Sequence, residues 1–173
     1  MGDLADIDDW RAIDSAGGPL LLLPDRARSD WTGIDGDDYE RACAVDGYLG
    51  VLEVGDDQAL LIGDEPASTA LLPTRAAGSL VIAKWTYGPN RPIVVASLRG
   101  VRLDRFPTAP EVRFTFQSSP QSLFDSASPG DEVREHLAAE LPAGEYVAST
   151  LTYEPARDIS LVLHWVRRTG DGG

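Results

Sequence analysis

The sequence predicts a mostly β protein of the α+β class, with largely antiparallel sheets built from hairpins and two or three short helices. Short apolar runs are separated by turn-forming glycine, proline and aspartate, as at 20–23 between two prolines. Residues 112–117 alternate apolar and polar, which is the period of a strand with one face in water. A length of 173 residues fits one domain, so we expect a single domain over 1–173 with a weak seam near 105–110.

The first third of the chain contains two segments that favour helix and one hairpin. Residues 1–16 carry mutually repelling aspartates with an apolar residue at every third position, which predicts a mobile acidic arm or a short docked helix. Residues 37–43 favour a short helix with acids in its first turn, and Cys43 is expected on its buried face and non-catalytic. Strands over 48–54 and 58–62 are expected to form a hairpin.

The remaining elements follow from apolar runs and their punctuation. Ser128, Pro129 and Asp131 have the spacing of a helix N-terminus, so we expect a helix from 128 that Pro142 ends, with His136 on its apolar face. The other expected strands are 80–87, 93–98, 112–117, 123–124, 145–153 and 158–168.

Acidic residues are concentrated in the first two-fifths of the chain. With 28 Asp and Glu against 15 Lys and Arg the net charge is −13. Residues 1–66 hold 17 acids and 4 bases, whereas 67–173 hold 11 of each. Nucleic acid and anionic membranes are poor partners for such a chain, because both are bound by clustered Lys and Arg. The asymmetry indicates an acidic face directed at a basic partner, with solubility alone as the alternative.

The sequence offers no pattern typical of an enzyme or a metal site. One cysteine and two histidines cannot form a zinc cluster, and neither a phosphate-binding loop nor a GxSxG nucleophile turn occurs. The loop from Asp35 to Asp46 begins like a calcium loop but departs from that pattern at three of its characteristic positions. We therefore expect no catalytic residues, no metal and no cofactor. The absence of a secretory leader and of a cysteine pair predicts a cytoplasmic protein.

A surface formed by the acidic loops is the best candidate site. Acids grouped around an aromatic side chain suit the binding of a basic protein, because the charge steers association and the ring anchors it. The alternative is that the tryptophan is a core residue and the acids are solvated turns. The candidate binding residues are Trp31, Asp35, Asp37, Asp38, Asp64 and Glu65.

Blocks along most of the chain resemble the Immunity protein 21 family, most densely over 15–69. The blocks, in order, are 17–20 and 23–24 with Trp31 and Gly33, then 38–43, 46–50, 58–60, 63–66, Thr69, Trp85, 123–127, 129–130, Tyr146, 153–155 and 161–164. The resemblance implies a bacterial cytoplasmic antidote, encoded beside a polymorphic toxin, that protects its producer by binding the toxin. It brings no catalytic residues.

The resemblance and the charge pattern together favour a non-enzymatic toxin inhibitor. A nuclease is a class of toxin that an acidic face would fit, because its nucleic-acid groove is basic. Two other function classes stay open from the residues alone. One is a small hydrolase that uses a carboxylate pair or Cys43, and the other is a ligand-binding β module. Neither the toxin nor the oligomeric state can be predicted from the sequence.

Overall fold

Two antiparallel sheets make up the fold in the computed structural model, which describes residues 2–63, 67–107 and 111–170. In spatial order the larger sheet consists of β1 (Ala12–Ile13), β5 (Ser68–Pro73), β6 (Ser79–Tyr87), β11 (Ile159–Arg168), β10 (Gly144–Ala156) and β7 (Val112–Phe116). The smaller sheet consists of β3 (Leu49–Val54), β4 (Asp57–Ile62), β2 (Leu20–Pro24), β8 (Gln121–Asp125) and β9 (Leu137–Ala139). The strand content is 45% and the helix content 17%, which confirms the predicted fold class.

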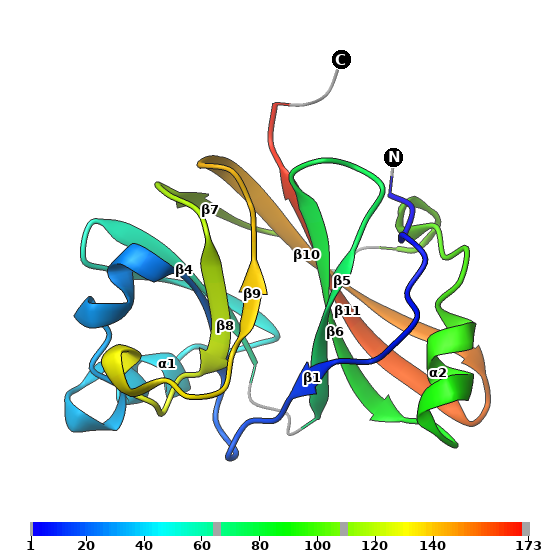
Figure 1. The fold of residues 1–173 in the computed structure, drawn as a ribbon, viewed down its shortest axis with the longest axis horizontal. Coiled ribbons are helices and arrows are strands. Elements are labelled where there is room, and N and C mark those ends of the chain that lie inside the picture. Colours follow the sequence, from blue (N-terminus) through cyan, green and yellow to red (C-terminus); the bar gives the residue numbers. More distant parts are fainter. Residues whose placement is uncertain (1, 64–66, 108–110, 171–173) are drawn as a thin grey trace.

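Short helices cover the outer faces of the two sheets. On the smaller sheet lie the 3₁₀ turns η1 (Asp25–Asp30) and η2 (Gly33–Asp35) and the helix α1 (Asp38–Cys43). On the larger sheet lies α2 (Arg91–Ser97), followed by η3 (Leu103–Arg105). A further turn, η4 (Gly130–Glu132), precedes β9. Figure 1 shows α1 and α2 at opposite ends of the molecule, with both sheets between them.

Alternate residues of the central strands face different core clusters. In β2, Leu20 and Leu22 point into the cluster between the sheets, whereas Leu21 and Leu23 point into the cluster under η1 and α1. On the larger sheet, alternate residues of β6 face the inter-sheet cluster and the cluster under α2 in the same way. Strands buried on both faces have no polar face, which is why these runs are continuously apolar.

The N-terminal segment is extended and packs along the larger sheet. Leu4, Ile7 and Trp10 are buried in the cluster under α2, and the Trp10 indole N–H donates to Ser68 Oγ at 2.9 Å. The aspartates between them face solvent. For residues 1–16 the sequence allowed either a mobile acidic arm or a short docked helix. Residues 2–16 contain no helix, so the second alternative is wrong.

Two predicted elements are wrong, one because of a local helix start and the other because of a tertiary contact. The strand expected at 93–98 is the helix α2, because Asn90 Oδ1 accepts from the Ile93 N–H at 3.1 Å and Pro92 occupies the first turn. The helix expected from 128 to 141 is instead η4, an extended stretch and the strand β9. Leu137 and Ala139 alternate into the inter-sheet cluster, and this burial outweighs the helical spacing.

The position of Cys43 is also corrected. Cys43 is exposed at the last residue of α1, whereas Ala42 beside it is 1% exposed and fills the inward position. The predicted seam near 105–110 lies partly outside the described residues.

Candidate functional site

The outer layer of the smaller sheet is held on the core by Trp31. Its side chain is 1% exposed and packs with Ala27 and Ala42, and its indole N–H donates to the Ser126 carbonyl at 2.9 Å. Trp31 is therefore a core residue. The sequence had left this open as the alternative to a role as the anchor of a binding surface. In this conformation its ring offers no surface to a partner.

Close backbone packing fixes the loop that follows Trp31. The Ile34 N–H donates to the Ala127 carbonyl at 3.0 Å, and the Gly130 N–H donates to the Trp31 carbonyl at 2.8 Å. Gly33 has a φ of 54°, and a Cβ at this position would lie 2.6 Å from the Ala127 carbonyl oxygen. Only glycine fits this left-handed backbone and this close approach. The loop is thus held in one conformation against the loop after β8.

Asp38 has a structural role within this layer. Its Oδ2 accepts from the backbone N–H of Thr32 at 2.8 Å and from the Thr32 hydroxyl at 2.9 Å, and its Oδ1 accepts from Arg41 at 2.6 Å. Burial alone would raise the pKa of Asp38, but the hydrogen bonds from Thr32 and Arg41 outweigh it and lower the pKa. The carboxylate is nearly buried and ties η2 to α1, so it is poorly placed to meet a partner.

Asp35 and Asp37, in contrast, are exposed, and their carboxylates have no hydrogen-bond or ion-pair partner within the described ranges. Four further acids from residues 25–57 share both properties. We call the six together the acidic layer: Asp30, Asp35, Asp37, Glu40, Asp46 and Asp56.

The three arginines of residues 25–57 are all engaged. Arg26 lies 3.5 Å from the buried Asp57, Arg28 donates to the Gly130 carbonyl, and Arg41 bonds to Asp38 and the Glu53 carbonyl. These contacts leave the six carboxylates of the acidic layer without a cation from their own segment. Such unpaired surface acids add no stability by pairing and repel one another. The layer therefore carries a net negative field toward solvent.

Ile34 is an exposed apolar side chain within the acidic layer, and sequence analysis missed it. Its side chain is 65% exposed, although its backbone is bonded to the loop after β8. Tyr48, which follows α1 in the chain, is 51% exposed. An isoleucine between Gly33 and Asp35 in a loop was the available signal, because a loop residue with no core position to fill is free to face outward.

Two of the predicted site residues, Asp64 and Glu65, lie outside the described residues. The remaining four thus divide into the core residue Trp31, the structural residue Asp38, and the exposed acids Asp35 and Asp37.

The other reactive side chains are not assembled into a site. His164 is fully buried between the sheets, with its Nδ1 2.9 Å from the Thr150 hydroxyl. Burial, together with the charge of Lys84, lowers the pKa of His164 to about 3, so its imidazole is neutral. Cys43 has no hydrogen bond to a histidine within the described part of the chain. The same residues contain no cluster of metal-binding side chains and no helix long and apolar enough to span a bilayer.

A family model described as Immunity protein 21 matches residues 9–158. This range contains the whole acidic layer and all strands from β1 to β10. No curated protein and no solved structure matches the chain.

Proposed function

Since the chain belongs to the Immunity protein 21 family, we propose that it is a non-enzymatic antidote that binds and neutralises a cognate bacterial toxin domain. The binding surface in this proposal is the acidic layer together with the exposed side chain of Ile34. The protein acts in the cytoplasm, where a toxin of the producing cell or of a neighbour would meet its target.

The uncompensated charge of the acidic layer is the observation that carries the proposal. Six exposed carboxylates face solvent while the arginines of the same segment are engaged elsewhere. A field of one sign speeds the encounter with a partner of the opposite sign by roughly 10–10³-fold. The partner in this proposal has a basic surface, of the kind by which nucleases hold nucleic-acid phosphates. Occupying that surface would exclude the toxin's substrate, and no chemistry by the immunity protein is needed.

The rigidity of the layer supports the same proposal. The loop that carries Ile34 and Asp35 is held by the bonds of Ile34 to Ala127 and of Gly130 to Trp31. A preformed loop loses little conformational entropy on binding, so more of the contact energy contributes to affinity. Ile34 adds an apolar side chain that a partner can desolvate, which is the usual composition of an interface centre.

Titration of the chain with the toxin domain encoded beside its gene tests the proposal. We expect a stable complex that the substitution Ile34→Ser weakens about tenfold, the scale of a truncated interface side chain. Ile93→Ser is the matched control, because Ile93 is 44% exposed but lies on α2 at the other end of the molecule. If the toxin domain does not bind, the immunity function is wrong. If both substitutions weaken binding equally, the acidic layer is not the interface.

A further inference from the structure

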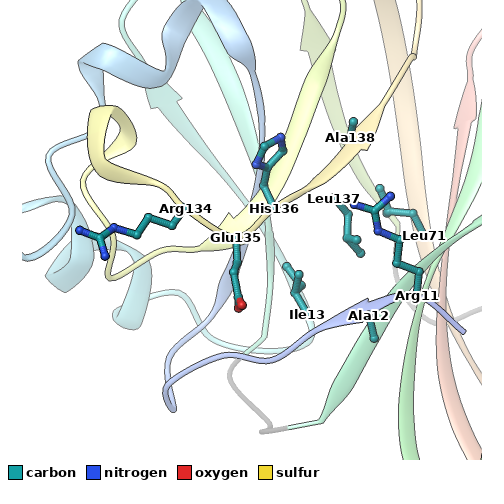
Figure 2. A pocket seen from close by; sticks show the side chains of 9 residues that line it. All are labelled: Arg11, Ala12, Ile13, Leu71, Arg134, Glu135, His136, Leu137 and Ala138. Atoms are coloured by element: carbon teal, nitrogen blue, oxygen red, sulfur yellow. The ribbon is translucent and has the colours of Figure 1, made fainter.

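A trough runs along the side of the molecule where the last strands of the two sheets face each other. It encloses about 510 Å³ between β9 of the smaller sheet and β1 and β5 of the larger sheet. Its floor is apolar and consists of Ile13, Leu71 and Leu137 (Figure 2). Two neighbouring hollows share lining residues with it, one through Leu71 and Ala138 and the other through Ile13 and Glu135. The trough and the first of these hollows together contact every residue of β9.

The strand β9 ends its sheet without a neighbour on its outer edge. It pairs with β8 through Leu137, Ala138 and Ala139, and no second strand of the described chain pairs with it. Natural proteins usually protect such edges by keeping the strand very short or by a proline, a charged side chain or a bulge, and of these devices β9 has only its length of three residues. The exposed residue at its centre is a small alanine, Ala138. The edge is therefore open to pairing with another extended chain.

Two opposite charges enter the trough from its two walls. Figure 2 shows the Arg11 side chain extending from the β1 side toward β9, and the Glu135 side chain extending from the β9 side toward β1. Within the described ranges neither side chain has a hydrogen-bond or ion-pair partner, and Arg11 is exposed. The trough thus presents Arg11 on one side of an apolar floor and Glu135 on the other, and Arg134 and His136 line it beside Glu135.

We propose that this trough binds an extended segment of the toxin, which adds to the smaller sheet as a strand beside β9. The segment has an apolar side chain over Ile13, Leu71 and Leu137, an acidic side chain facing Arg11 and a basic side chain facing Glu135. Main-chain hydrogen bonds to β9 hold the segment, and the two charges set its register. This inference rests on the proposed function and adds to it a second contact that is independent of the acidic layer.

Hydrogen exchange with and without the neighbouring toxin domain tests the proposal at the backbone. We expect the amides of 137–139 to exchange more slowly in the complex. Two substitutions test the side chains. Ala138→Trp fills the trough and Arg11→Glu reverses its cation, and each should raise Kd about tenfold. Their matched controls are Ala96→Trp and Arg99→Glu, which make the same changes at exposed positions on and after α2.

The outcomes separate this inference from the proposed function. A complex that forms without protection at 137–139, and that both trough variants form with parental Kd, overturns the trough while the immunity function stands. If the chain alone sediments as a dimer that Ala138→Trp dissociates, the occupant is a second copy and the proposal is also wrong. Protection at 137–139 with tenfold losses for both trough variants, and parental Kd for both controls, confirms it.

Discussion

The indole N–H of Trp31 donates to the carbonyl of Ser126, a residue 95 positions later in the chain. This bond, 2.9 Å long and fully buried, joins the loop that carries the acidic layer to the loop that ends β8. The most conspicuous aromatic residue of the acidic segment therefore holds the acidic layer in place. The same loop exposes Ile34, to which the proposed function assigns the apolar contact with the toxin.

Replacing Trp31 should lower the free energy of unfolding. Trp31→Phe removes the hydrogen bond to Ser126 and part of the packing with Ala27 and Ala42, so we expect a loss of about 1–3 kcal/mol in the free energy of unfolding. Trp31→Ala should cost about 3–5 kcal/mol because it also leaves a cavity. Urea unfolding measures both. Equal stability of Trp31→Phe and the parent would contradict the buried bond.

Asp38 should stabilise the fold mainly as a carboxylate. Its pKa is lowered in the folded state, so its contribution is present above the unfolded value of about 4 and is lost as the pH falls through the folded pKa. Asp38→Asn should cost about 1–3 kcal/mol at neutral pH, since the Arg41 contact loses its charge. Unfolding free energies of parent and variant should therefore converge at low pH. A constant difference down to pH 2 would show that the charge of Asp38 is unimportant.

His164 should make the fold sensitive to mild acid. Its pKa is about 3 when folded and about 6.5 when unfolded, so protons bind preferentially to the unfolded chain between these values. Stability should fall by about 1.4 kcal/mol per pH unit as the pH drops below 6.5. His164→Leu removes this titration while leaving Thr150 without its partner. The variant should lose less stability than the parent between pH 7 and pH 5, as measured by urea unfolding. Identical losses would contradict a neutral buried His164.

Cys43 should be reactive toward thiol reagents and dispensable for folding. Because it is exposed at the end of α1, Cys43→Ala should change the free energy of unfolding by less than about 0.5 kcal/mol. Native protein should be modified by a thiol reagent as fast as the unfolded chain. Slow modification that becomes fast only on unfolding would restore the sequence-based expectation of a buried thiol.

Much of the fold could be predicted because strand periodicity is a local property. The alternation at β7 and the apolar run of β2 identify their strands, and the glycine turn at 55 marks the hairpin of β3 and β4. The strand β9 was missed because it depends on distant contacts, whereas α2 begins at a local N-cap, Asn90 followed by Pro92, that the prediction did not weigh. A helical spacing from Ser128 gives way to β9 because Leu137 and Ala139 fill the core between the sheets. Conversely, the β-branched run of α2 is helical because its buried side packs on the larger sheet.

The candidate site was predictable in its charge but not in its geometry. The excess of acids over bases is visible in the composition, and Asp35 and Asp37 are exposed as their loop position suggests. Trp31 is buried and Ile34, three positions later in the same loop, is exposed. The difference arises because Trp31 packs against the loop that contains Ser126. Local sequence contains no signal of that contact.

The most direct measurement of the central claim is the association rate constant with the neighbouring toxin domain as a function of salt. The Asp35→Asn/Asp37→Asn double variant removes two unpaired charges of the acidic layer. Asp158→Asn/Glu154→Gln removes the same charge from the end of β10 and the turn that follows it. For the parent we expect a rate that falls steeply with salt. The acidic-layer variant should associate several-fold more slowly with a shallower slope, while the control keeps the parental rate and slope. A parental rate and slope for the acidic-layer variant would contradict the account.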